Sequence, residues 1–281
     1  MKKVGIALVV IVLMLGAFAL GTMNASKVIS IPTAKWTEGN DAAQAWREYS
    51  ASLEAAGARI FAANDDPGER IEGLEYLAQL ASASLEIKLA KGSRVHPQFT
   101  DWMGDYRKFL GDSPDAIYHT AELSPAYRYE ISGSRGDAEY LGFMLYGQQL
   151  NGWNRAAANL SSKTINFDEA GRFTLLLSKA APTDPEINWL ELEDDIHMIM
   201  VRQYYHSRDG KTVADFTIRN LDGPGHEKAG EEEVATRLRD AAAFFNDTLD
   251  GAITLSSFET PAPGRAFSII RFERLPGGLL S

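Results

Sequence analysis

The stretch that decides the fold is IYHTAELSPAYRYEIS, residues 117–132. Its first half places Ile117, His119, Ala121 and Leu123 on one face and Tyr118, Thr120 and Glu122 on the other, a period of two. The alternation resumes after Ser124-Pro125 through Tyr127, Tyr129 and Ile131. Because strands with this period, separated by turn residues, are typical of antiparallel sheets, we predict that β structure begins here.

Outward from this stretch, short strands are expected across residues 116–222. The runs at 140–146 and 197–205 are apolar on both faces, which predicts strands buried from both sides. Residues 147–158, rich in Gly, Asn and Gln, are expected to form a loop. Further strands are predicted at 164–167, 172–178, 188–190 and 212–219. Short strands joined by turns indicate an antiparallel β-sandwich or barrel.

Helical periodicity flanks the β region. Helices are predicted at 41–60, 67–91 and 231–250, and Asp66-Pro67 has the residue types of a helix start. The expected inner faces carry Trp46, Tyr49, Leu53, Ala56 and Ile60 on the first helix and Ile71, Leu74, Leu77, Ala81, Leu85 and Leu89 on the second. The expected fold class is therefore α+β: an antiparallel β-sandwich on which two N-terminal helices and a C-terminal helix pack. One body would cover residues 41–281 (helical at 41–110), with a final edge strand at 266–271.

The N-terminus carries an export or membrane signal. Lys2 and Lys3 precede an uncharged apolar run, residues 4–20, which would be roughly 26 Å long as a helix. Within residues 1–25 this length fits either a cleaved signal peptide or an uncleaved inner-membrane anchor, and both alternatives stay open. Residues 26–40 are then a tether. The lysines favour a body outside the cytoplasm, in the periplasm, either soluble or anchored by residues 4–20.

Composition excludes several functional classes. The 281 residues contain no cysteine, which excludes thiolate catalysis, zinc–thiolate sites and iron–sulfur clusters. The 38 acidic residues outnumber the 28 basic ones, a net charge of -10 that argues against a nucleic-acid partner. A phosphate-binding glycine loop and a His-x-x-x-His pair are both absent from the sequence, so no cofactor and no metal site is predicted.

Acidic residues and a histidine cluster where the helical region gives way to the sheet. Asp112, Asp115 and His119 lie within eight residues of one another, as acid–base chemistry requires. The alternative is a turn in which the Asp carboxylates accept hydrogen bonds from nearby backbone N–H groups. Asp112, Asp115 and His119 are therefore the catalytic candidates if the protein is an enzyme, a question that the sequence leaves open.

Arg202 interrupts the apolar strand at 197–205. Burial of a guanidinium is costly without an acidic partner, so Arg202 either forms a structural ion pair or binds an anionic or polar ligand. The expected acidic partner is Asp115 or Asp112, and Glu130 is the next candidate. Aromatic residues for a ligand groove are plentiful, although core packing also explains them: Tyr118, Tyr127, Tyr129, Tyr140, Tyr146, Trp153, Trp189, Tyr204 and Tyr205. The ligand-binding candidates are Arg202, Tyr118, Tyr204, Trp189 and Arg128.

Several stretches, in this order, carry a family resemblance: 69–77 (ERIEGLEYL), 111–118, 127–136 (YRYEISGSRG), 167–173, 188–190 (NWL) and 202–204 (RQY). Together they resemble domain of unknown function 1214, a family of uncharacterised bacterial proteins. The family has Asn before its Pro-Asp step, whereas this chain has Ser113, which removes any ligand contact that the Asn makes. The resemblance implies a jelly-roll-like β-sandwich with helical additions, often in exported proteins, and supplies no catalytic residue.

Two functions are therefore expected. The first is a binding or accessory module of the cell envelope for a small polar or sugar-like ligand, with contact to the inner membrane if residues 1–25 are not cleaved. The alternative is a carboxylate-dependent hydrolase or lyase that acts on an envelope glycan or small molecule. The enzyme needs two titratable groups that converge on one cavity, whereas the module needs aromatic and polar groups on one surface.

Overall fold

The computed structural model describes residues 39–63, 65–104, 107, 109, 113, 115–148, 154–223 and 229–258. All of them belong to one compact unit, Gly39–Ser281. The predicted signal or anchor, all but the end of the tether, the predicted edge strand at 266–271 and Asp112 lie outside the described residues. In the part of the chain described, no helix is long and apolar enough to cross a membrane.

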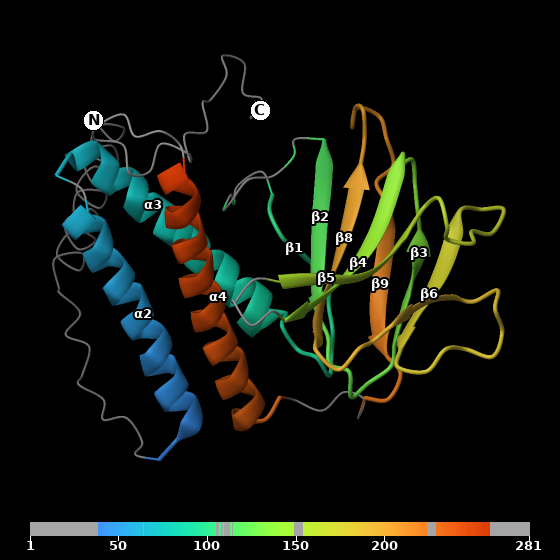
Figure 1. Cartoon of the computed structure of the whole chain (residues 1–281), viewed down its shortest axis with the longest axis horizontal. Coiled ribbons are helices and arrows are strands. Elements are labelled where there is room, and N and C mark those ends of the chain that lie inside the picture. Colours follow the sequence, from blue (N-terminus) through green and yellow to red (C-terminus); the bar gives the residue numbers. More distant parts are fainter. Residues whose placement is uncertain are drawn as a thin grey trace, which may run out of the picture. The chain divides into compact units, whose positions relative to one another are not determined.

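Two sheets face each other in a β-sandwich (Figure 1). The five-stranded sheet has the order β1 (Thr100–Asp101), β2 (Ala116–Glu122), β8 (Ile196–Tyr204), β4 (Tyr140–Gln148) and β5 (Asn154–Ser161). The four-stranded sheet has the order β7 (Asn188–Glu191), β6 (Arg172–Ser178), β3 (Tyr129–Ser134) and β9 (Asp215–Asn220). Neighbouring strands are antiparallel except β6 and β7, which are parallel. Fully buried Ile131, Phe143, Leu175 and Val201 belong to the core that both sheets share.

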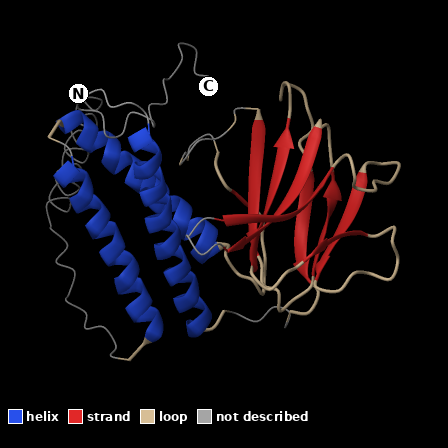
Figure 2. Ribbon diagram, viewed as in Figure 1, coloured by secondary structure: helices blue, strands red, loops and turns tan. Residues whose placement is uncertain are grey.

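The helices cover the other face of the five-stranded sheet (Figure 2). They are α2 (Asp41–Ala63), α3 (Pro67–Ser84), which continues as a π-helical segment at Leu85–Ala90, and α4 (Glu231–Phe258). Met198 and Met200 of β8 share a core with Leu80, Ile87 and Phe245 of the helices. The α+β class and the antiparallel β-sandwich with two N-terminal helices and a C-terminal helix are therefore confirmed.

Strand β8 lies between β2 and β4, as its two apolar faces predict. Ile199 and Val201 point into the sandwich core, and Met198 and Met200 point toward the helices. Because side chains alternate along a strand, Arg202 shares the outer face with the two methionines. The register of β8 thus places Arg202 outside the sandwich core.

Two strand predictions are wrong. Residues 154–158, the second half of the loop expected at 147–158, belong instead to the edge strand β5, which pairs with β4. Small residues such as Ala156 and Ala158 give β5 no clear alternation, and its pairing with β4 through the backbone is what places it in the sheet. Residues 164–167, expected to form a strand, follow β5 as a turn, in which the N–H groups of Thr164 and Ile165 donate to the Ser161 carbonyl at 2.8 and 2.9 Å. The two-residue strand β1 was not expected.

The predicted inner faces of the first two helices are partly wrong. Trp46, Ile71 and Leu74 are 43%, 58% and 41% exposed. The packed faces instead use small side chains, among them fully buried Ala45 and buried Gly73. Periodicity of large apolar residues misses such a face, because close helix contact selects for small volume. The predicted start of α3 is confirmed: Asp66 Oδ1 accepts from the N–H groups of Gly68 and Glu69 at 2.7 and 3.1 Å.

Candidate functional site

Three of the predicted ligand-binding residues meet on the outer face of the five-stranded sheet. Arg202 of β8 pairs with Tyr118 of β2 on one side and with Gly142 of β4 on the other. Two residues further along β8, Tyr204 pairs with Tyr140 of β4. Tyr146 lies on the same face of β4. We call the resulting group the tyrosine–arginine cluster; its members, all partly exposed, are Tyr118, Tyr140, Tyr146, Arg202 and Tyr204.

The guanidinium of Arg202 is held by tyrosines. Its Nη2 donates to Tyr146 Oη at 2.7 Å, and its central carbon lies 5.9 Å from the ring centroid of Tyr118 and 6.0 Å from that of Tyr146. These distances are at the outer limit of cation–π attraction. The tyrosines therefore orient the guanidinium without neutralising its charge.

The remaining rings pack around Gly142. A Cβ atom at position 142 would lie 2.5 Å from Tyr140 Oη, so only glycine leaves room for the Tyr140 ring. Tyr140 then meets Tyr204 edge to face, with ring centroids 5.7 Å apart and an interplanar angle of 74°. The glycine at position 142 thus allows two aromatic rings to pack edge to face beside Arg202.

Tyr118 supplies a neutral phenol to the cluster. Burial raises its pKa above the usual value, and the neighbouring phenol of Tyr204 acts in the same direction, although a hydrogen bond from the Ser113 N–H opposes the shift. That N–H lies 3.3 Å from Tyr118 Oη. The phenol therefore remains protonated near neutral pH and can both donate and accept.

The predicted acidic partner of Arg202 is wrong for both acids that the structure describes. Glu130 lies in the other sheet and accepts from Arg219 Nη2 at 2.9 Å. Asp115 is exposed in the turn before β2, where its carbonyl accepts from the Tyr205 N–H at 3.0 Å. Across the described ranges, no carboxylate forms an ion pair with Arg202.

The described members of the acid–base group do not converge. His119 turns away from Tyr118 toward the inner face of the sheet, where its ring lies 5.3 Å from that of Phe216. Burial lowers the pKa of His119, and Asp101, whose Oδ1 is 3.0 Å from Nδ1, opposes that shift. Asp115 is four residues away, about 13 Å along an extended chain. Asp115 and His119 are therefore not placed to act on one substrate atom.

Trp189 and Arg128 lie with the four-stranded sheet, apart from the cluster. Trp189 Nε1 donates to the Ser178 carbonyl at 3.2 Å, and Arg128 Nη2 donates to Asp222 Oδ1 at 2.7 Å. In the sequence, Tyr140 and Tyr146 are merely two of many aromatic candidates. Their even separation on β4 predicts that they share a face of the sheet. It does not predict that this face adjoins Arg202 unless β4 is known to pair with β8.

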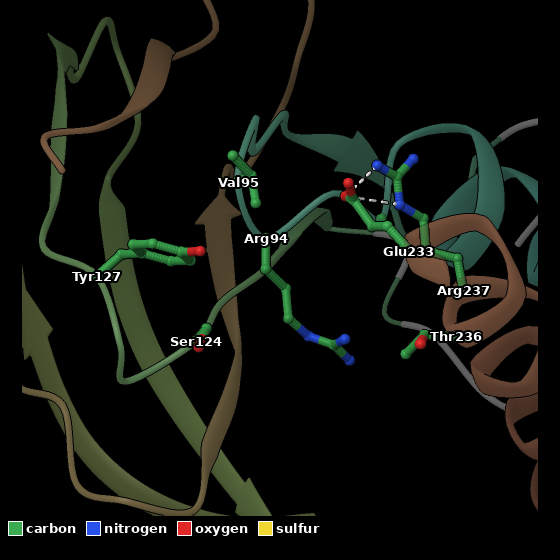
Figure 3. Close-up of a pocket in the computed structure, with 8 residues that line it drawn as sticks. Arg94, Val95, Ser124, Tyr127, Glu233, Thr236 and Arg237 are labelled. Atoms are coloured by element: carbon green, nitrogen blue, oxygen red, sulfur yellow. Dashed lines mark hydrogen bonds and ion pairs between the residues drawn. The ribbon is translucent and has the colours of Figure 1, made fainter. Parts of the chain in front are cut away.

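A cavity of about 210 Å³ lies between the sandwich and α4 (Figure 3). We call it the junction pocket; Gly92, Arg94, Val95, Ser124, Tyr127, Glu233, Thr236 and Arg237 line it. Its charges are internally balanced: Arg237 donates to Glu233, and Arg94 Nη2 lies 2.6 Å from Asp240 Oδ2 and 3.6 Å from Glu122 Oε2. A ligand there would compete with existing ion pairs, whereas a ligand at Arg202 would compete with none formed by the described residues.

Comparison with known proteins supports the fold. No protein-family model matches the chain, and no curated protein matches it. An uncharacterised protein from Burkholderia cenocepacia has a similar structure, with a TM-score of 0.69 and 25% identity over 76% of this chain and 60% of that one. The VPA0106 protein from Vibrio parahaemolyticus has a TM-score of 0.31 and 13% identity over 54% and 43% of the two chains. The chain thus spans about 60% of the Burkholderia protein and is similar to it in fold, while the resemblance to domain of unknown function 1214 stays a prediction.

Proposed function

We propose that the protein is a binding module for a small polar or sugar-like molecule, which it holds at the tyrosine–arginine cluster. One observation carries the proposal. Arg202 lies on the outer face of the sheet, and within the described part of the chain its contacts are to tyrosines and not to a carboxylate. Because these tyrosine contacts do not neutralise the guanidinium, Arg202 can still bind a polar or anionic ligand from solution.

The chemistry of the cluster suits such a ligand. Tyr140 and Tyr204 present aromatic faces and edges on which a sugar ring or another flat group can pack. The phenols of Tyr118 and Tyr204 add donors and acceptors for hydroxyl groups. A few polar groups placed among aromatic surfaces are typical of small-molecule sites.

The alternative function, a hydrolase or lyase, has less support. It requires two titratable groups at one cavity, but Asp115 is exposed in a turn and His119 faces the interior of the sandwich. The third candidate, Asp112, lies outside the described residues. We therefore favour binding over catalysis.

Titration of the full-length protein with a panel of monosaccharides, sugar acids and small aromatic acids, followed by calorimetry and thermal shift, tests the proposal. We expect at least one member to bind. Tyr204→Ala should weaken that binding by about tenfold or more, because it removes one aromatic face worth roughly 1–2 kcal/mol and a phenol.

Tyr127→Ala is the matched control, because it removes a tyrosine from the junction pocket instead. It should leave the affinity unchanged. If Tyr127→Ala abolishes binding and Tyr204→Ala does not, the ligand occupies the junction pocket and the assignment to the cluster is wrong. If no compound binds the unaltered protein, the proposed function fails for these ligand classes.

A further inference from the structure

Arg202 has more donors than its contacts with the described residues use. A guanidinium carries five N–H donors in one plane. In the described part of the chain, one of them is used, the Nη2 donor to Tyr146. Its chain neighbours Val201 and Gln203 are fully buried and point into the sandwich, so neither side chain lies on the face of the sheet that carries Arg202.

Other arginines of this acidic protein are heavily paired. Arg94 contacts both Glu122 and Asp240, and Arg155 contacts both Glu193 and Asp195. Arg239 likewise contacts Asp41 and Glu48. A net charge of -10 makes carboxylates abundant, yet the tyrosine–arginine cluster contains one cation and no anion. The cluster is therefore complementary to a ligand that brings its own negative charge.

We propose that the ligand of the tyrosine–arginine cluster carries a carboxylate and that Arg202 binds that group; this inference rests on the proposed function. The flat donor fork of a guanidinium matches the two oxygens of a planar carboxylate. A phosphate group is less well matched, because it brings up to two negative charges to a cluster that offers one positive charge. The rings of Tyr140 and Tyr204 then contact the body of the ligand.

Two sources of a carboxylate fit this chemistry, a sugar acid and a small aromatic acid. Each is tested on the full-length protein against its own neutral amide, which has nearly the same shape: galacturonate against galacturonamide, and phenylacetate against phenylacetamide. We expect the acid of at least one pair to bind at least about tenfold more tightly than its amide, because hydrogen bonds to charged groups are stronger. The pair that shows the preference identifies the source.

The Arg202→Gln variant should remove this preference for the acid while it still binds the amide. Arg202→Lys should restore only part of the preference, because an ammonium lacks the planar fork. Arg219→Gln is the control for loss of an arginine, since Arg219 is exposed and paired with Glu130 in the other sheet. Circular dichroism and melting temperature establish that each variant is folded, and the acid–amide comparison in the unaltered protein needs no variant.

The outcomes separate the two proposals. If acids and amides bind equally in both pairs, the carboxylate inference is wrong although the proposed binding function stands. If the preference for the acid persists in Arg202→Gln, another cation binds the carboxylate and the inference is again wrong. If neither acids nor amides bind, the proposed function and the inference fail together for these compounds.

Discussion

Lys88 and Glu122 form a buried ion pair between the helices and the sandwich. Lys88 Nζ lies 2.5 Å from Glu122 Oε1, and the two side chains are 11% and 3% exposed. Among the described residues Glu122 Oε2 has no hydrogen-bond partner, although Arg94 Nη2 is 3.6 Å away. Because removal of one member leaves an uncompensated buried charge, such a pair is far costlier to break than to replace.

The Lys88→Met variant should therefore lower the free energy of unfolding by about 3–5 kcal/mol, nearer the lower value because Arg94 remains beside Glu122. The double variant Lys88→Met with Glu122→Met should recover much of that loss. Urea denaturation of the single and double variants measures both effects. A double variant as unstable as the sum of its single variants would contradict this account.

Lys179 and Asp194 provide the matched control. Their N–O distance is also 2.5 Å, but the side chains are 56% and 90% exposed. Solvent screens an exposed pair, so Lys179→Met should change the free energy of unfolding by no more than about 1 kcal/mol. An equal loss in Lys88→Met and Lys179→Met would show that burial does not determine the cost.

At the scale of elements, the close approach of α2 and α3 depends on one glycine. A Cβ atom at Gly73 of α3 would lie 2.8 Å from Ile60 Cγ2 of α2, and Ile60 is 1% exposed. At Gly57 of α2, a Cβ atom would meet nothing within 4 Å. Both glycines lie within helices, so replacement by alanine gives the same gain in helix propensity at each position. The two positions differ only in how closely a neighbouring side chain packs.

Gly57→Ala should raise the free energy of unfolding by about 0.5–1 kcal/mol, because alanine is the better helix former. Gly73→Ala should lower it despite the same gain, because overpacking at Ile60 costs about 1–3 kcal/mol. Melting temperatures of the two variants measure this difference in sign. Equal increases would mean that α2 and α3 separate at little cost.

At the scale of the whole molecule, we expect the body to be exported, because Lys2 and Lys3 precede the apolar run at 4–20. A reporter that is active only outside the cytoplasm, fused after Ser281, should be active. The same fusion without residues 1–25 is the control and should be inactive. Full activity of a cytoplasm-only reporter at the same position would refute export.

The fold was predictable to the extent that each element has its own periodic pattern. Strand β8 is recognisable from its sequence as a strand buried on both faces, and the core residues of α4, Leu238, Ala241, Phe245 and Leu249, recur at the three- and four-residue spacing of a helix. Strand β5 has no such pattern, because an edge strand of small residues is held through its backbone. The prediction that Trp46 and Leu74 face the core is wrong for a related reason. The buried faces of those helices consist partly of small residues, which a search for large apolar residues misses.

The amino-acid sequence alone predicts the fold class, the helices, most of the strands in their order, and Arg202 as an unusual charge in an apolar strand. Those properties depend on local periodicity and on the cost of burying a cation. The tertiary structure alone decided which side chains meet there. Strand pairing brings Tyr118 of β2 and Tyr140 and Tyr146 of β4 to the face of β8 that carries Arg202. Strands β2, β4 and β8 are neighbours in the sheet but distant in the sequence, so the local pattern of one strand does not show which strands pair with it.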